Sequence, residues 1–205
     1  MSLPDKFMPH TVIRLVVAGF LLLVSCSSGQ ADGGTAANSR VDSLYTTLKV
    51  NSCTQEIDKD DPNETPYQVC PGVAGYILQV RLVDSGRLSV IVVNPAKRRF
   101  PLDYQDVVTR SMDNLGDKAE WRIRRENGKA VPIALIVRVM AREKPGHPEK
   151  ITNIYWAVAK ITPGGACVTD RIREGSKSAA EVRALADSAI GRPCATRLPR
   201  LADAG

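Results

Sequence analysis

The chain has 205 residues and a formal charge of +6, and 43% of its residues are hydrophobic but only 5% are aromatic. This length and composition predict one globular domain with a mainly aliphatic core. The positive charge is too small for a nucleic-acid-binding arm, so we expect no nucleic-acid partner, although it favours anionic polymers and membrane surfaces.

Residues 1–25 are typical of a bacterial signal peptide. Arg14 precedes ten uncharged, mostly apolar residues at 15–24. That run is too short to span a bilayer as a helix, but it has the length of the apolar region of a secretion signal. The sequence therefore predicts export.

The apolar run ends at residues 23–26, Leu-Val-Ser-Cys, which resemble a bacterial lipobox. The resemblance implies cleavage before Cys26 and acylation of that cysteine, and a membrane partner through this lipid anchor. Because Ser27 is not Asp, the usual signal for retention at the inner membrane is absent, so we expect a periplasmic protein anchored to the outer membrane. Ordinary signal-peptide cleavage nearby is the alternative, and it would give a soluble periplasmic or secreted protein.

Residues 26–43 are small and polar and predict a flexible tether ahead of a domain at 44–194. Short strand-like pieces flank an acidic turn at 58–64. A clear hairpin follows, because two runs rich in Val, Ile and Leu, at 76–83 and 87–93, are joined by Asp-Ser-Gly.

Residues 94–118 are ambiguous between helix and strand, but the block at 120–191 is easily interpreted. It has the pattern of four strands separated by turns, and then a helix. We expect both of its tryptophans, Trp121 and Trp156, to face a core. Ser178 and Glu181 form a capping box at the start of the helix, and residues 195–205 resemble a frayed tail. The predicted fold is therefore α+β, an antiparallel meander of six to eight strands with a C-terminal helix packed on it.

The predicted domain contains four cysteines once Cys26 is used for lipid: Cys53, Cys70, Cys167 and Cys194. In an exported protein such an even set indicates disulfides. Of the three possible pairings we predict Cys53–Cys70, which flanks the acidic turn, and Cys167–Cys194, which ties the last strand to the end of the helix. Zinc is the alternative, but there is no Cys-x-x-Cys pair and no neighbouring histidine, so we expect no metal and no cofactor.

No catalytic residue can be assigned from the sequence. His147 lies between Gly and Pro in a turn, where its ring is not oriented rigidly. Catalysis by a Ser-His-Asp or Cys-His arrangement requires a rigidly oriented histidine base. Asp117 and Glu120 are candidates for a pair of hydrolytic acids only because they are carboxylates. We therefore expect a non-catalytic binding or envelope-interaction module. The alternatives are an envelope-polymer hydrolase and an inhibitor of an exogenous hydrolase such as lysozyme.

Two groups of basic residues are candidates for binding an anionic partner, either an envelope polymer or another envelope protein. The alternative is that they are ordinary solvated charges. These residues are Lys97, Arg98, Arg99, Arg122, Arg124 and Arg125. The Cys-Pro-Gly turn at 70–72 is a further candidate, because glycines permit close approach of the backbone.

The order of several short motifs resembles a family of small exported, disulfide-containing proteins of alphaproteobacteria, over about residues 45–194. The motifs are Tyr-Thr-Thr-Leu at 45–48 leading to Cys53, Cys-Pro-Gly at 70–72 with Gly75 and Tyr76, Glu-Trp-Arg at 120–122 with Arg138 after an Asn-Gly turn, Cys167, and the Ala-rich helix with Cys194. The resemblance implies disulfides and a periplasmic location. It brings no assigned activity and no catalytic residues.

Overall fold

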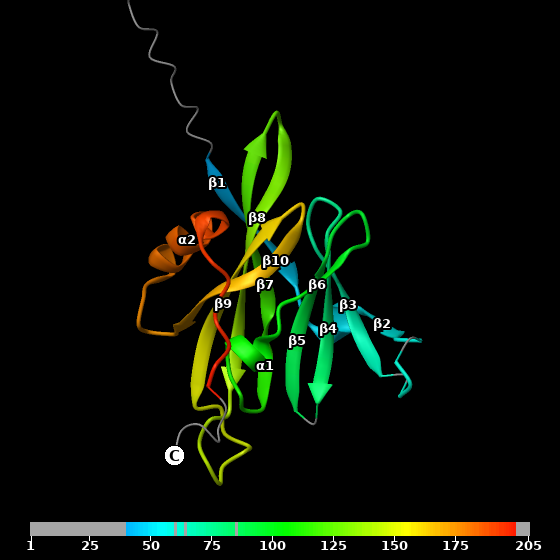
Figure 1. Ribbon diagram of the computed structural model, residues 1–205, viewed down its shortest axis with the longest axis vertical. Helices are drawn as coiled ribbons and strands as arrows, with labels where there is room; N and C mark the ends of the chain where they lie inside the picture. Colours follow the sequence, from blue (N-terminus) through cyan, green and yellow to red (C-terminus); the bar gives the residue numbers. More distant parts are fainter. Residues whose placement is uncertain (1–39, 60, 64, 85, 200–205) are drawn as a thin grey trace, which may run out of the picture. The chain divides into compact units, whose positions relative to one another are not determined.

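The computed structural model describes residues 40–59, 61–63, 65–84 and 86–199. The predicted signal peptide, Cys26 and residues 26–39 of the tether lie outside the described residues. Within the described part, strands form two antiparallel sheets, and one helix of more than two turns packs on the outer face of the first sheet (Figure 1). The α+β class and the antiparallel meander are confirmed.

The first sheet is built from the block that the sequence singled out, with one strand added from far away. It consists of β1 (Val41–Thr47), β7 (Asp113–Glu126), β8 (Lys129–Ala141), β9 (Asn153–Thr162) and β10 (Gly165–Arg173), in that spatial order. The meander β7–β10 matches the predicted strands. The added strand, β1, runs antiparallel to β7 and pairs from Val41 opposite Arg124 to Thr47 opposite Lys118.

The second sheet comes from the first half of the domain. It consists of β2 (Thr54–Ile57), β3 (Pro66–Pro71), β4 (Ile77–Asp84), β5 (Arg87–Val93) and β6 (Arg99–Pro101), in sequential order. The predicted hairpin around Asp-Ser-Gly is confirmed as β4–β5. The ambiguous stretch 94–118 forms β6, the one-turn helix α1 (Tyr104–Val107) and the start of β7; the remaining short helices are η1 (Val50–Ser52) and η2 (Ala189–Gly191).

The prediction of one sheet with six to eight strands was wrong, because the described residues form ten strands in two sheets. The main core lies between the sheets. It joins Leu78 and Val92 of the second sheet to Trp121, Leu135 and Val137 of the first. Periodicity along the chain indicates that a strand has an apolar face, but it does not say which other strand covers that face.

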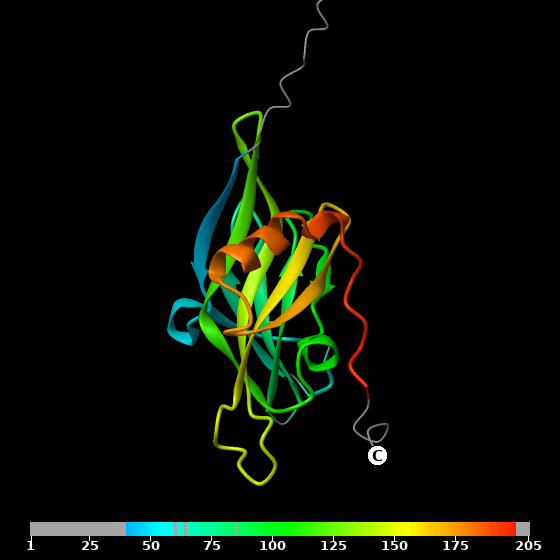
Figure 2. The same ribbon diagram turned by 90° about the vertical axis from the view of Figure 1, so that its left-hand side faces the viewer.

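A smaller core lies on the outer face of the first sheet, under α2 (Ala179–Asp187), which crosses the strands in Figure 2. Ile136 and Val158 of the sheet pack against Val182 and Ala186 of the helix. The predicted capping box is confirmed, because the Ser178 hydroxyl accepts from the Glu181 N–H and the Glu181 carboxylate accepts from the Ser178 N–H.

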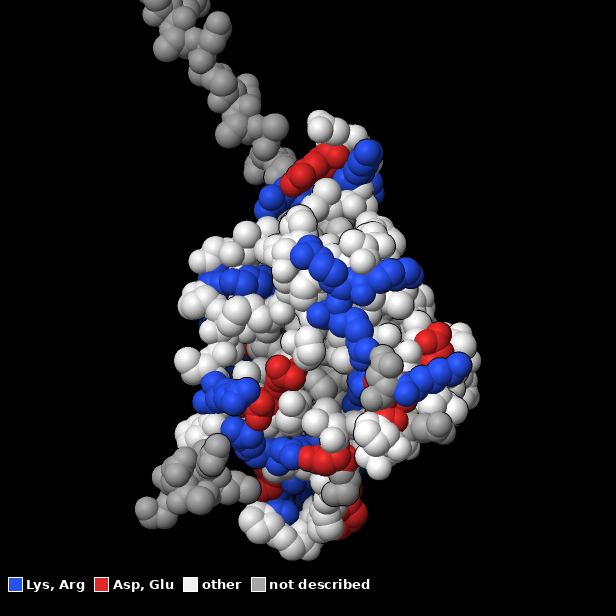
Figure 3. Space-filling model, turned by 45° about the vertical axis from the view of Figure 1, so that its right-hand side comes forward, with Lys and Arg blue, Asp and Glu red and all other residues white. Residues whose placement is uncertain are grey.

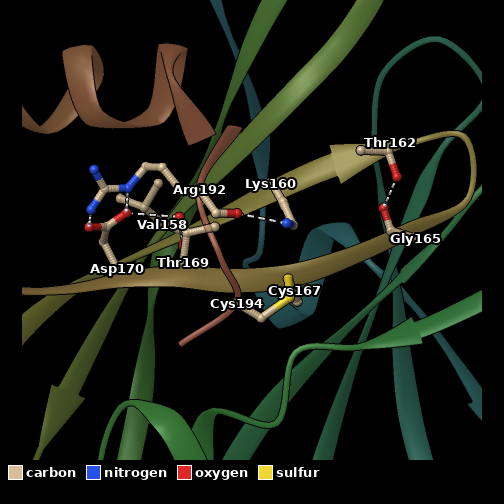
Figure 4. Close-up of a disulfide and its surroundings, with 9 residues drawn as sticks. All are labelled: Val158, Lys160, Thr162, Gly165, Cys167, Thr169, Asp170, Arg192 and Cys194. Carbon is tan, nitrogen blue, oxygen red and sulfur yellow. Dashed lines mark hydrogen bonds and ion pairs between the residues drawn. A yellow bond between two sulfur atoms is a disulfide. The ribbon is translucent and has the colours of Figure 1, made fainter. Parts of the chain in front are cut away.

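Both predicted disulfides are confirmed: Cys53–Cys70 joins the segment before β2 to β3, and Cys167–Cys194 fastens the chain after α2 to β10. Figure 4 shows the second disulfide beside Arg192, whose Nε donates to Asp170 Oδ2 at 2.9 Å. The helix is therefore held on the sheet by packing, by a covalent bond and by an ion pair.

Candidate functional site

A hollow of about 520 Å³ lies on the half of the outer face of the first sheet that α2 leaves uncovered. We call it the outer hollow. Its floor and rim include Lys118 and Glu120 of β7, Arg138 and Met140 of β8, and Trp156 of β9. Strand alternation places these side chains on the face opposite to Trp121 and the main core.

Trp156 packs against the smaller core under α2, so both tryptophans face a core as expected, but Trp156 is only partly buried and the rest of its ring lines the outer hollow. It lies opposite Arg138 on the neighbouring strand, and the Arg138 guanidinium carbon is 5.3 Å from the centre of the indole ring. Arg138 also donates to Glu174 at 2.7 Å. Alternation assigned Trp156 correctly to the face of Val158, but that face is covered by α2 for only part of its length.

A bulge in β7 shapes one rim of the hollow. Leu115 pairs with Val139 and Ala119 with Val137, so three residues of β7 lie opposite Arg138 alone. A Cβ added to Gly116 in this bulge would lie 3.1 Å from the Arg138 Cβ, so glycine allows this close packing. A glycine inside a strand often marks a bulge, so Gly116 could have indicated this one. The bulge was not predicted, because the sequence did not show whether residues 94–118 form a helix or a strand.

An ion pair between Arg183 of α2 and Glu120 of β7 forms the side of the hollow next to the helix. The Arg183 Nε donates to Glu120 Oε1 at 2.6 Å, and another Arg183 nitrogen donates to the Tyr45 hydroxyl at 3.0 Å. Burial raises the pKa of Glu120, but the hydrogen bonds from Arg183 and Ser43 outweigh this effect and hold the pKa below its ordinary value. Glu120 is therefore a fixed negative charge.

Arg122, predicted as part of an exposed basic face, is instead 7% exposed beneath α2. Its Nε donates to Asp187 Oδ1 at 2.6 Å, and a second nitrogen donates to Ser43. The alternation of residues along the strand correctly predicted that Arg122 points away from the main core. However, α2 covers that position, so Arg122 holds the helix to the sheet and cannot belong to an exposed face that binds an anionic partner.

The structure places four of the other five predicted basic residues on two neighbouring turns. Lys97 and Arg98 lie in the β5–β6 turn, and Arg124 and Arg125 lie beside the β7–β8 turn, at the same end of the domain. Arg99 lies on β6 and approaches Asp58 at 4.0 Å. Figure 3 shows Lys and Arg gathered in the upper part of that view, with one acidic patch among them at the tip, whereas acidic and basic residues are more evenly mixed in its lower part.

The Cys-Pro-Gly turn has a packing role in the structure. A Cβ added to Gly72 would lie 2.3 Å from the Tyr76 carbonyl oxygen and 3.1 Å from the Trp121 ring. The Tyr76 ring in turn lies 6.2 Å from the Trp121 ring, centre to centre. The glycine is therefore required by contacts inside the domain.

Among the described residues no group of three or more His, Cys, Asp or Glu is placed to hold a metal ion, and no helix is long and apolar enough to cross a membrane. His147 is exposed in the β8–β9 turn, with its Nδ1 3.3 Å from Glu149. Comparison of the chain with protein-family models, with curated proteins and with solved structures finds no match to any of them.

Proposed function

We propose that the chain is a lipid-anchored protein of the bacterial envelope that binds a partner in the outer hollow and does not catalyse a reaction. The observation that carries this proposal is the composition of the hollow. It combines an apolar floor, formed by Ile136, Met140 and Trp156, with cations at its rim. Concave sites of this kind bind ligands that have an apolar part and a few charged groups.

The charges of the hollow favour a negatively charged partner. Glu120 is neutralised by Arg183 at 2.6 Å, and Asp117 lies 3.5 Å from Lys49 outside the hollow. Lys118 is exposed and makes no ion pair with any residue that the structure describes. An acidic segment of another envelope protein, or an anionic envelope polymer, therefore finds both apolar contact and a cation here.

The two carboxylates of the hollow are unsuited to glycoside hydrolysis, the alternative function. A general acid needs a raised pKa so that it stays protonated near neutral pH. The pKa of Glu120 is instead held low by Arg183 and Ser43, and Asp117 is exposed to solvent. These properties of the two carboxylates favour a binding function over hydrolysis by proton transfer.

The binding proposal is tested by capture from envelope extract with three forms of the intact protein. Mass spectrometry and sugar analysis of the eluates identify protein and polymer ligands. Lys118→Glu reverses a charge at the hollow, and Lys150→Glu makes the same change in the exposed β8–β9 turn. We expect Lys118→Glu to lower capture of the specific ligand about tenfold or more and Lys150→Glu to leave it unchanged. Equal capture by all three forms would exclude the outer hollow as the site.

The anchor is tested separately. Cys26→Ala removes the sulfur that an acyl chain requires, so we expect the variant to leave the membrane fraction. A variant that still sediments with membranes would show that acylation of Cys26 does not hold the protein there.

A further inference from the structure

Four turns and the first residues of β1 lie toward one end of the domain, which we call the loop end, and the β7–β8 turn projects beyond the other three (Figures 1 and 2). The turns are at 72–76, 94–98, 126–129 and 162–165, and the N-terminal half of β1 lies beside the third turn, with Val41 opposite Arg124. The Asn94 side chain donates to the Pro163 carbonyl oxygen at 3.4 Å and so links two of the turns. Figures 1 and 2 show these turns and the start of β1 in the upper part of both views.

The loop end carries a concentrated positive charge. Its described residues include six cations, which are Arg40, Lys97, Arg98, Arg124, Arg125 and Lys129. They include two acids, Asp42 and Glu126. The turns at 72–76 and 162–165 contain no charged residue. Most of the formal charge of +6 is therefore located at this end.

These cations stand on well-defined turns. The Asn94 side-chain oxygen accepts from the Arg98 N–H at 2.9 Å, and Lys97 has a left-handed backbone with φ of 62°. Asn127 and Gly128 also have positive φ, as a tight hairpin turn requires. Lys97 and Lys129 are exposed and form no ion pair with any described residue.

Both ends of the domain contain ion pairs, and at the loop end Arg124 pairs with Glu126 while Arg40 and Arg125 pair with Asp42. The loop end differs in its balance of charge, because its six cations outnumber its two acids, whereas arginines at the opposite end have acids of their own nearby. Arg87 pairs with Asp84, and Arg110 lies 2.7 Å from Asp106. Neutralised pairs attract an anionic surface little. The contrast gives the domain an electrostatic direction, with its positive pole at the loop end.

We propose that the loop end docks against anionic lipid headgroups of the membrane that holds the acyl chain. This inference rests on the proposed anchor at Cys26, because the tether must enter the described domain at Arg40, at the loop end. Each Lys or Arg close to an anionic membrane surface strengthens binding about fivefold, and the attraction decays over about 10 Å in 0.1 M salt. Docking would present the rest of the domain, with the outer hollow at its side, to the periplasm.

The experiment uses protein with Cys26→Ser, so that no acyl chain contributes, and vesicles of either pure phosphatidylcholine or a mixture with phosphatidylglycerol. The difference in binding between the two vesicle types measures the electrostatic part alone. We expect stronger binding to the anionic vesicles, weakened by added salt. We expect Lys97→Glu with Lys129→Glu to weaken that binding about tenfold or more.

The matched control makes the same charge change at the opposite end, with Lys144→Glu and Lys150→Glu, both in the exposed β8–β9 turn. Its binding should stay within about twofold of the parent. Equal weakening by both double variants would overturn the docking surface in favour of a general charge effect. Binding to a soluble anionic polymer without any preference for anionic vesicles would also overturn it. Neither result bears on the anchor, which membrane fractionation of Cys26→Ala tests.

Discussion

The first residue of β7 makes the stability of the domain depend on pH in a way that one substitution should remove. Asp113 is 2% exposed, and its Oδ1 accepts from the Leu88 N–H at 2.7 Å. Its Oδ2 has no hydrogen-bond partner among the described residues. Burial raises the pKa of this carboxyl from 3.8 to about 6, although the Leu88 bond, Arg87 and Arg142 act in the opposite direction.

The size and sign of the effect follow from linkage between protonation and folding. A shift from 3.8 to about 6 is about 2 pKa units, which corresponds to about 3 kcal/mol at 1.36 kcal/mol per unit. Because the folded state binds the proton more tightly, the stabilisation is fully present below pH 3.8 and is lost as the pH rises through 6. Asp113→Asn keeps an oxygen for the Leu88 N–H and carries no charge at any pH.

We therefore expect Asp113→Asn to be more stable than the parent by about 2–3 kcal/mol at pH 8 and similar to it at pH 3.5. Urea unfolding followed by tryptophan fluorescence, from pH 3.5 to 8, measures this difference. The control is Asp117→Asn, which changes an exposed carboxyl of the same strand. A difference that does not vary with pH, or a less stable variant at pH 8, would refute the reasoning.

Three further changes test the packing, the cross-link and the cap. Gly72→Ala should cost about 2–3 kcal/mol in the free energy of unfolding, because the new methyl group would collide with the Tyr76 carbonyl oxygen; a melting temperature within a degree of the parent would contradict this. Replacing Cys167 and Cys194 by Ala opens a loop with a sequence separation of 27 and should cost about 3.5 kcal/mol in urea unfolding, and an unchanged midpoint would count against it. Ser178→Ala should cost about 1 kcal/mol by thermal melting and Ser178→Asp much less, whereas equal losses would exclude a capping role.

Features with a local cause could be predicted from the sequence. The capping box needs only Ser178 and Glu181 at the correct spacing, and the Asn-Gly turn between β7 and β8 needs only two residues. The disulfides were accessible for the same reason, since each pair flanks a short, interpretable unit. Such features depend on a few neighbouring residues and not on the partners of a distant face.

The outer hollow could not be predicted, because it depends on distances across the fold. Its wall pairs Glu120 with Arg183, 63 residues away in sequence. Arg122 and Trp156 were each assigned to the correct face of a strand, yet their burial depends on where α2 lies. The helix α2 covers one part of the outer face of the first sheet and leaves the rest of that face open. The alternation of apolar and polar residues along a strand predicts the face of a side chain, but it does not predict whether the helix covers it.

If the proposed anchor at Cys26 holds the protein to a membrane, the position of β1 has a mechanical consequence. Tension on the tether would enter the domain at Val41 and pull along the axis of β1, which is paired with β7 over all its seven residues. That geometry loads the inter-strand hydrogen bonds in shear, so they must yield together and not one at a time. If β1 did yield, the Cys53–Cys70 bond would carry the force directly from residue 53 to residue 70, so the enclosed loop would bear no load and could not be pulled out straight.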